Sequence, residues 1–254
     1  MDRRPLKFET GASSHVGLVR QRNEDDYLVQ PEIGVWAVAD GMGGHARGDL
    51  ASATVIRALK SIGMPASAPD LIARFENRVN VANSKLIDAT RELGVGIMGS
   101  TIAALLAHEW SYSCLWSGDS RVYRIRAGII EQLSRDHTEV QELLDRGVLS
   151  RQEALTWAGQ NTITRAIGVE DDPELELQQG EIEAGDRFVI CSDGLTGHVA
   201  DAEILNLVAG RTPQDACDAL ITLALGRGGS DNITVIVVDC RDDDESDTIV
   251  QSVV

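Results

Sequence analysis

The stretch VWAVADGMGGHARGDLASATVIRALKSIG, residues 35–63, contains the two kinds of element that decide this fold. Its first six residues, 35–40, are mostly apolar and lead into Asp40-Gly41, a pattern that is typical of a buried strand followed by a turn. Residues 48–63 then place apolar side chains at the i, i+3, i+4 spacing of one helix face. A buried strand therefore leads through a glycine-rich corner into an amphipathic helix.

Further strands and helices follow on either side of this stretch. Strands are predicted at residues 8–14, 27–30, 100–109, 110–119, 175–182, 187–193 and 232–240, and residues 121–133 are predicted to split at Ala127-Gly128 into a hairpin. Helices are predicted at residues 69–93, 200–210 and 212–228, with Thr212 as an N-cap, and short helices in a polar, mobile insertion at 138–160. Because strands occur in runs and helices in pairs, the sequence favours an α+β layered fold with mostly antiparallel sheets over a doubly wound parallel sheet.

The composition restricts the class of partner. The 254 residues carry a formal net charge of −17, which argues against a nucleic-acid or acidic-membrane surface. The N-terminal residues lack the apolar stretch of a signal peptide, and no run approaches the length of a membrane span. The four cysteines are widely separated and form no Cys-x-x-Cys pair, as is typical of reduced core residues. A cytoplasmic protein is expected.

Four aspartates stand where a predicted strand ends or begins beside a glycine or serine: Asp40, Asp119, Asp193 and Asp231. Any one such aspartate is most often a β-turn residue. Four in one chain are expected to form a carboxylate cluster at one edge of the sheets, because such corners hold a side chain rigidly and let the backbone approach a ligand. Hard oxygen donors suit Mg²⁺ or Mn²⁺, and no Cys/His pattern supports zinc.

Eight ordered motifs resemble those of the metal-dependent Ser/Thr protein phosphatases of the type 2C (PPM) family, in its bacterial form. They are GLVRQRNEDD (17–26), ADGMGGHARG (39–48), MGST (98–101), WSGDSRVYRIR (116–126), SRDHT (134–138), TRAIG (164–168), CSDGLTGHV (191–199) and SDNITVIVV (230–238). The resemblance covers about residues 8–240. It predicts a catalytic domain over residues 1–240, followed by an acidic, weakly ordered C-terminal tail over residues 241–254.

The resemblance implies an αββα β-sandwich flanked by helix pairs, with a binuclear metal site at one end. Asp40 matches the carboxylate that bridges both metals, and the Gly41 carbonyl matches a ligand of one of them. Asp193 and Asp231 match ligands of the other metal. Two or three Mn²⁺ or Mg²⁺ ions are therefore expected.

Further site residues also follow from the resemblance. Glu24 and Asp25 match an acidic pair that holds the metal site directly or through water. Asp119 matches a position that helps to bind a third metal in bacterial members. Arg20 matches the phosphate-binding arginine, whose planar fork can grip two phosphate oxygens. The implied reaction is hydrolysis of phosphoserine and phosphothreonine by a metal-bridged hydroxide.

Three other polar residues receive separate predictions. Animal and plant relatives carry a histidine directly after Asp-Gly, where this chain has Met42, and His45 follows three residues later. His45 is therefore a candidate general acid, while a water molecule in that role, or a surface role for His45, is equally consistent with the sequence. His137 is expected to tie its loop to the sandwich by a hydrogen bond. Asn232 is expected to orient Asp231 rather than to bind metal.

Two alternatives remain at this stage. A catalytically inactive module of the same fold would bind phosphoproteins without hydrolysing them, although the metal carboxylates and Arg20 are all retained. A nucleotide phosphodiesterase would need a basic or aromatic base-binding surface, which the net charge and the 4% aromatic content do not offer. The family resemblance further implies a monomer that acts on phosphorylated proteins. These include a bacterial Ser/Thr kinase and forkhead-associated proteins, among them regulators of type VI secretion.

Overall fold

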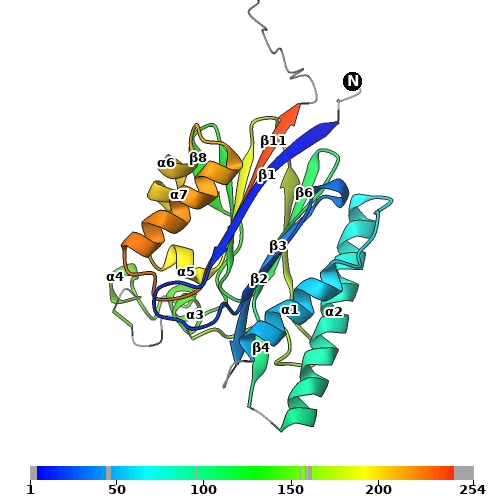
Figure 1. The fold of residues 1–254 in the computed structure, drawn as a ribbon, viewed down its shortest axis with the longest axis vertical. Coiled ribbons are helices and arrows are strands. Elements are labelled where there is room, and N and C mark those ends of the chain that lie inside the picture. The colour runs from blue at the N-terminus through cyan, green and yellow to red at the C-terminus, as the bar shows by residue number, and fades with distance from the viewer. Residues whose placement is uncertain are drawn as a thin grey trace, which may run out of the picture.

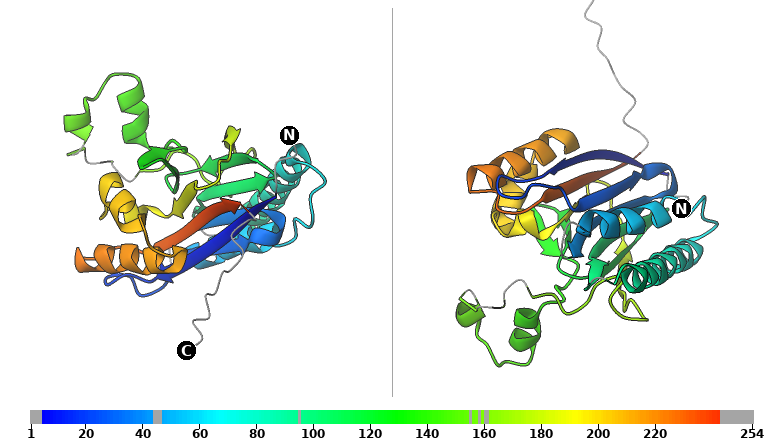
Figure 2. Two further views of the ribbon diagram at one scale, coloured as in Figure 1. Left: turned by 90° about the horizontal axis from the view of Figure 1, so that it is seen from above. Right: turned by 60° about the horizontal axis from the view of Figure 1, so that its bottom comes forward.

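Two antiparallel β-sheets lie face to face, and helices cover their outer faces (Figures 1 and 2). The computed structural model describes residues 5–43, 47–94, 96–154, 156–157, 159 and 162–242. The first sheet has the order β1 (Leu6–His15), β11 (Ile233–Asp242), β10 (Arg187–Cys191), β7 (Arg121–Arg126) and β8 (Ile129–Gln132). The second sheet has the order β2 (Asp25–Gln30), β3 (Val35–Gly43), β5 (Ile102–His108), β6 (Ser111–Ser117) and β9 (Glu176–Glu181), with β4 (Met98–Ser100) paired to β3.

The helices fall into pairs, as the sequence predicts. Helices α1 (Gly48–Leu59) and α2 (Ala68–Leu93) pack against the second sheet. Helices α6 (Asp201–Val208) and α7 (Pro213–Gly226) lie over the first sheet, and Thr212 caps α7 by accepting from the Asp215 amide. Helices α3 (Glu139–Asp145) and α4 (Arg151–Ala154) protrude from one end of the sandwich, beside the short helix α5 (Asp193–Thr196) (Figure 2). The predicted α+β sandwich of antiparallel sheets is confirmed.

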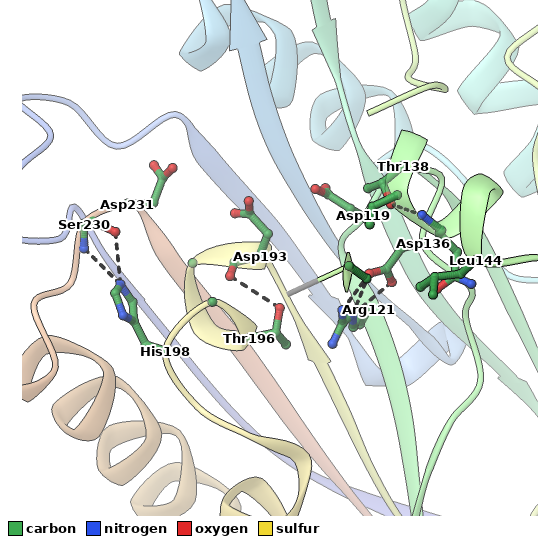
Figure 3. A pocket seen from close by; sticks show the side chains of 15 residues that line it. Asp119, Arg121, Asp136, Thr138, Leu144, Asp193, Thr196, His198, Ser230 and Asp231 are labelled. Atoms are coloured by element: carbon green, nitrogen blue, oxygen red, sulfur yellow. Dashed lines mark hydrogen bonds and ion pairs between the residues drawn. The ribbon is translucent and has the colours of Figure 1, made fainter. Parts of the chain in front are cut away.

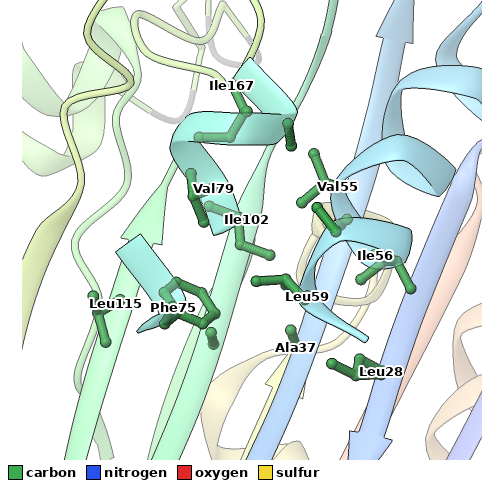
Figure 4. Close-up of a cluster of buried hydrophobic side chains, with 14 of the residues drawn as sticks. Leu28, Ala37, Val55, Ile56, Leu59, Phe75, Val79, Ile102, Leu115 and Ile167 are labelled. Carbon is green, nitrogen blue, oxygen red and sulfur yellow. The ribbon is translucent and has the colours of Figure 1, made fainter. Parts of the chain in front are cut away.

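Three layers of buried side chains hold these elements together. Trp36, Phe188 and Ile236 lie fully buried between the two sheets. Val55, Leu59 and Phe75 fill the layer between the second sheet and helices α1 and α2 (Figure 4). A third cluster, formed around Leu220 and Val237, fills the layer beneath α6 and α7. Burial of each large apolar side chain contributes about 1.5–3 kcal/mol, so these layers fix the sheets on which the polar residues stand.

The structure differs from the predicted elements mainly near the acidic corners. Residues 100–109 do not form one strand, because Thr101 leaves the sheet pairing and exchanges hydrogen bonds with the backbone of Asp40. Helix α5 directly follows β10 and was absent from the prediction. Ala127 and Gly128 both have positive φ, which suits the predicted hairpin turn between β7 and β8. All four cysteines are free and buried, as predicted, and no described helix has the length and apolar character of a membrane span.

Candidate metal centre

Five aspartates from both sheets gather at one end of the sandwich. Asp25 and Asp40 stand directly opposite each other on the neighbouring strands β2 and β3. Asp119 lies in the turn between β6 and β7, Asp193 begins α5 two residues after the last residue of β10, and Asp231 lies two residues before the first residue of β11. Asp119, Asp193 and Asp231 surround one pocket of roughly 560 Å³ (Figure 3). The four predicted corners therefore come together, and Asp25 joins them.

The mutual proximity of these carboxylates disfavours their charged forms. Burial raises the pKa of Asp25 to about 7 and that of Asp119 to about 8, and the charge of Asp193 adds to both effects. Burial also raises the pKa of Asp40 well above its usual range, and the charges of Asp25 and Asp193 add to this effect. The pKa of Asp193 is raised by burial and by the charge of Asp231, although Asp193 shares a side-chain hydrogen bond with Asp40. Nearby positive charge is needed to keep such a cluster ionised at neutral pH.

The donor set fits Mn²⁺ or Mg²⁺. The Asp25 carboxylate accepts from the Ser192 hydroxyl through Oδ2 at 2.7 Å, whereas its buried Oδ1 has no hydrogen-bond partner. An unpaired buried oxygen is costly unless a donor or a cation satisfies it. Every candidate ligand is a carboxylate or carbonyl oxygen, the type that these hard cations prefer. Within the described residues, no group of three or more acidic, histidine or cysteine side chains is arranged closely enough to coordinate one metal ion. The match of these residues to Mn²⁺ or Mg²⁺ therefore rests on their charge, their burial and the chemistry of their oxygen atoms.

The corner at Gly41 is held by backbone contacts that exclude any side chain. The Gly41 amide donates to the Glu24 carbonyl at 3.0 Å, and a Cβ at Gly41 would lie only 1.9 Å from the Gly48 carbonyl oxygen. The Glu24 carboxylate accepts from the Gly48 amide at 3.2 Å, at the N-terminus of α1. An acidic side chain is favourable at this helix end. Glu24 therefore links the backbone at Gly41 to the first residue of α1.

Asn232 contacts Asp231, as predicted, and also holds a second group. Its side chain does not contact the Asp231 carboxylate; only its backbone amide does, at 2.9 Å. The side-chain amide donates to the carbonyls of Val16 and Arg22, and its oxygen accepts from the Glu24 amide at 2.8 Å. Because these three contacts span the loop from residue 16 to residue 24, Asn232 fixes the loop that carries Arg20. The predicted contact with Asp231 is made by the backbone amide of Asn232, and nothing in the sequence indicates that its side chain also holds this loop.

Arg20 contacts the acidic cluster through Asp231. Its Nη2 atom donates to the Asp231 Oδ2 at 2.7 Å, and its side chain is 53% exposed. The hydrogen bond that the guanidinium donates to Asp231 raises the pKa of Arg20, so its positive charge persists at any physiological pH. Neither Glu24 nor Asp25, although close in sequence, forms an ion pair with Arg20 among the described residues. Arg20 thus stands at the edge of the cluster with about half of its side chain exposed to solvent.

Comparison with known proteins identifies the family. The model of the family described as Protein phosphatase 2C matches residues 14–218. The chain belongs to the protein phosphatase 2C family. It is 38% identical to the serine/threonine protein phosphatase PstP of Mycobacterium tuberculosis, over 98% of this chain but 48% of PstP. The chain therefore spans about half the length of PstP, and it covers 92% of the serine/threonine phosphatase stp of Listeria innocua at 33% identity.

Solved structures agree with this assignment. PppA, a regulatory component of the type VI secretion system in Pseudomonas aeruginosa, matches 92% of this chain and 97% of its own with a TM-score of 0.86 and 39% identity. The catalytic domain of PstP in complex with two manganese ions matches 93% of this chain and 100% of its own, with a TM-score of 0.84 and 38% identity. The predicted family, fold and class of cofactor are confirmed at the level of the family.

Of the three predicted histidine and asparagine roles, that of His137 agrees best with the structure. The Gly118 amide donates to His137 Nδ1 at 3.2 Å, and the His137 amide donates to the Gly118 carbonyl at 2.9 Å. The ring stacks on Trp116, and burial lowers the pKa of His137. It therefore ties its loop to the turn that carries Asp119. His45 lies outside the described residues.

Sequence reasoning missed several residues that support this PP2C site. The hydroxyls of Ser100 and Thr101 contact the backbone of Asp40, and Thr101 also contacts the Ser120 hydroxyl at 2.7 Å. Arg121 binds Asp136 through two nitrogens in the wall of the pocket (Figure 3). His198 Nε2 accepts from the Ser230 amide at 3.1 Å, next to Asp231. These contacts join residues that are far apart in the sequence, so the motifs containing them were the only signal available.

Proposed function

We propose that this PP2C domain hydrolyses phosphoserine and phosphothreonine in proteins with the help of Mn²⁺ or Mg²⁺. The observation that carries the proposal is the gathering of four aspartates around Asp40, with the half-exposed Arg20 beside them. Such a cluster combines a place for divalent cations with a cationic group for phosphate. The membership of the chain in a phosphatase family supports the same reaction.

The residues divide into those that hold ions and those that hold substrate. Ions would be held by Asp25, Asp40, the Gly41 carbonyl, Asp119, Asp193 and Asp231, with Glu24 bracing the corner. When bound, the ions neutralise phosphate charge and lower the pKa of a water molecule towards neutrality.

Arg20 would bind the phosphate of the substrate. Its guanidinium can exchange its single contact with Asp231 for two parallel hydrogen bonds to phosphate oxygens, the geometry for which a planar fork is suited. Asn232 would keep the loop of Arg20 in place during this exchange, because its contacts are made to the loop backbone and not to Arg20 itself.

The proposed setting is that of a bacterial signalling phosphatase. Its substrates would include a Ser/Thr kinase and forkhead-associated proteins, among them regulators of type VI secretion. Similarity to PppA supports this last group. We further propose a cytoplasmic monomer whose catalytic domain covers the predicted residues 1–240 together with Arg241 and Asp242, which end β11.

The test is phosphate release from a phosphothreonine peptide, measured with the full chain after EDTA treatment. Activity should be absent in EDTA and should return with Mn²⁺ or Mg²⁺. Binding of the phosphopeptide without phosphate release in saturating Mn²⁺ would instead support the inactive phosphoprotein-binding module. Turnover in EDTA equal to that in Mn²⁺ would contradict metal dependence.

A further inference from the structure

A groove of roughly 350 Å³ is lined by residues of helices α1 and α2 and by Met98 of β4. We call it the α1–α2 groove and define it by Leu50, Arg57, Arg78, Val81, Lys85 and Met98. Leu50 and Val81 expose 41% and 37% of their surfaces, whereas Met98 is buried at the base. The groove therefore has an apolar floor bordered by three cations, and none of the described acidic residues lines it.

These three cations are unusual in so acidic a chain. Most described arginines form an ion pair with a carboxylate, but none of the ion pairs in the described residues involves Arg57, Arg78 or Lys85. The buried Nε of Arg78 has no hydrogen-bond partner, and its Nη1 contacts only the neighbouring Asn77 at 3.3 Å. Asp49 and Asp88, acids on the same two helices, are paired with Arg22 and Arg91. The groove therefore suits a partner that combines negative charge with apolar side chains.

One segment of this chain has that composition. Residues 243–254, DDESDTIVQSVV, place four acidic residues within the first five positions and four β-branched apolar residues after them. The acidic part is complementary to the cations of the groove, and the valines and isoleucine are of a size to cover its floor. We infer that residues 243–254 occupy the α1–α2 groove. This goes beyond the catalytic role proposed above and does not depend on it.

The segment begins close enough to reach the groove. Asp242, the last residue of β11, is paired with Leu6 of β1. Leu6 lines one small pocket together with Met64 and Pro65, which belong to the loop between α1 and α2. Ser61, at the near end of the groove, stands only three residues before Met64. Twelve residues can span up to about 40 Å, whereas the groove from Ser61 to Leu50 is about 16 Å long.

The inference can be tested by paramagnetic labelling of the full chain. A nitroxide reagent should react only with the thiol introduced by Val250→Cys, because all four native cysteines are buried. Amide signals of Arg57, Ser61 and Lys85 should lose intensity, and they should recover when the nitroxide is reduced. Intensity loss confined to other surfaces would overturn the inference. A second sample would mix chains that carry the nitroxide with unmodified chains whose amide signals are observed. Intensity loss in that mixture would place the segment on a second copy of the chain and would also overturn the inference.

Charge reversal supplies the matched control. Arg57→Glu combined with Lys85→Glu alters two exposed side chains, so the fold should be retained, and the ratio of docked to free segment should fall by a factor on the order of ten. Arg151→Glu changes an exposed cation on α4 and should leave the effect intact. In about 0.5 M NaCl the wild-type effect should also weaken, because the screening length falls to about 4 Å. An unchanged effect in the double variant would contradict the docking proposal.

Discussion

The guanidinium of Arg20 donates a hydrogen bond to Asp231, with Nη2 2.7 Å from Oδ2. This contact joins the expected phosphate-binding residue to an expected metal ligand. From the sequence, the two residues are predicted to act separately, one on phosphate and the other on metal. The structure couples them, because a cation that binds Asp231 must compete with Arg20 for its carboxylate.

Replacing Arg20 should therefore weaken the binding of substrate without weakening the binding of metal. In Arg20→Ala, KM for a phosphopeptide should rise and kcat/KM should fall by a factor on the order of ten to a thousand, as expected for one or two charge-assisted hydrogen bonds. The affinity for Mn²⁺, measured by calorimetry, should not fall, because Asp231 loses a competing cation. Arg20→Lys should recover only part of kcat/KM, since an ammonium cannot form the bidentate contact. Kinetics within about twofold of wild type in both variants would remove Arg20 from the phosphate site.

Asn232→Ala should loosen the loop that carries Arg20. It removes three hydrogen bonds to the backbone of residues 16–24. Because the backbone groups then lack partners, the free energy of unfolding should fall by about 1–3 kcal/mol. The value of kcat/KM should fall as well. Asn232→Asp retains the acceptor for the Glu24 amide but loses the two hydrogen bonds donated to carbonyls. Its free energy of unfolding and its kcat/KM should therefore also lie below those of wild type. Asn77→Ala, on the exposed face of α2, is the matched control and should leave both quantities unchanged.

Gly41→Ala tests the packing of the corner beside Asp40. Its methyl group would overlap the Gly48 carbonyl, so β3 or the start of α1 must shift, at a cost of about 1–3 kcal/mol. Affinity for Mn²⁺ should fall along with stability. Gly226→Ala is the control, because a Cβ there meets nothing within 4 Å. If Gly41→Ala matched this control in denaturant unfolding and in Mn²⁺ calorimetry, the corner would not depend on close backbone approach.

The metal-free protein should become less stable as the pH rises from 5 to 8. The pKa values of Asp25 and Asp119 are raised to about 7 and about 8, so in this range the folded state binds more protons than the unfolded state. The melting temperature in EDTA should therefore fall towards pH 8. Mn²⁺ competes with these protons, so it should raise the melting temperature more at pH 8 than at pH 5. A metal-free melting temperature that increases over this range would contradict the electrostatic description of the cluster.

The elements and the acidic corners could be predicted from the sequence because both depend on local patterns. The strand predicted at residues 35–40 and the cap at Thr212 are encoded in neighbouring residues, and the structure has both, although β3 continues beyond Asp40 to Gly43. Contacts between distant segments could not be predicted in this way. The Asn232 side chain lies more than 200 positions from Val16 and Arg22, and nothing in the local sequence indicates that it holds their loop.

The break at Thr101 illustrates the same limit of local patterns. The β-branched and apolar residues around it predict a continuous strand, yet the strand is interrupted at Thr101, whose hydroxyl and amide both contact the backbone of Asp40 on β3. A requirement at the site thus overrides the local preference for a strand. Likewise, the salt bridge of Arg20 to Asp231 depends on how β11 is placed beside the loop of residues 16–24, which only the folded chain reveals.

The most direct test is to compare Asp40→Asn with wild type for both phosphate release and metal-free stability. Asp40 lies at the centre of the acidic cluster, so its neutral amide should lower kcat by several orders of magnitude in saturating Mn²⁺ and weaken Mn²⁺ binding. Removing one charge from the cluster should at the same time raise the melting temperature of the metal-free protein at pH 8. Asp26 follows Asp25 on β2 and stands opposite Ala39 rather than Asp40. Asp26→Asn is the control and should change neither property. Near wild-type phosphate release by Asp40→Asn, with unchanged Mn²⁺ affinity, would contradict the central claim that this carboxylate cluster is the catalytic metal centre.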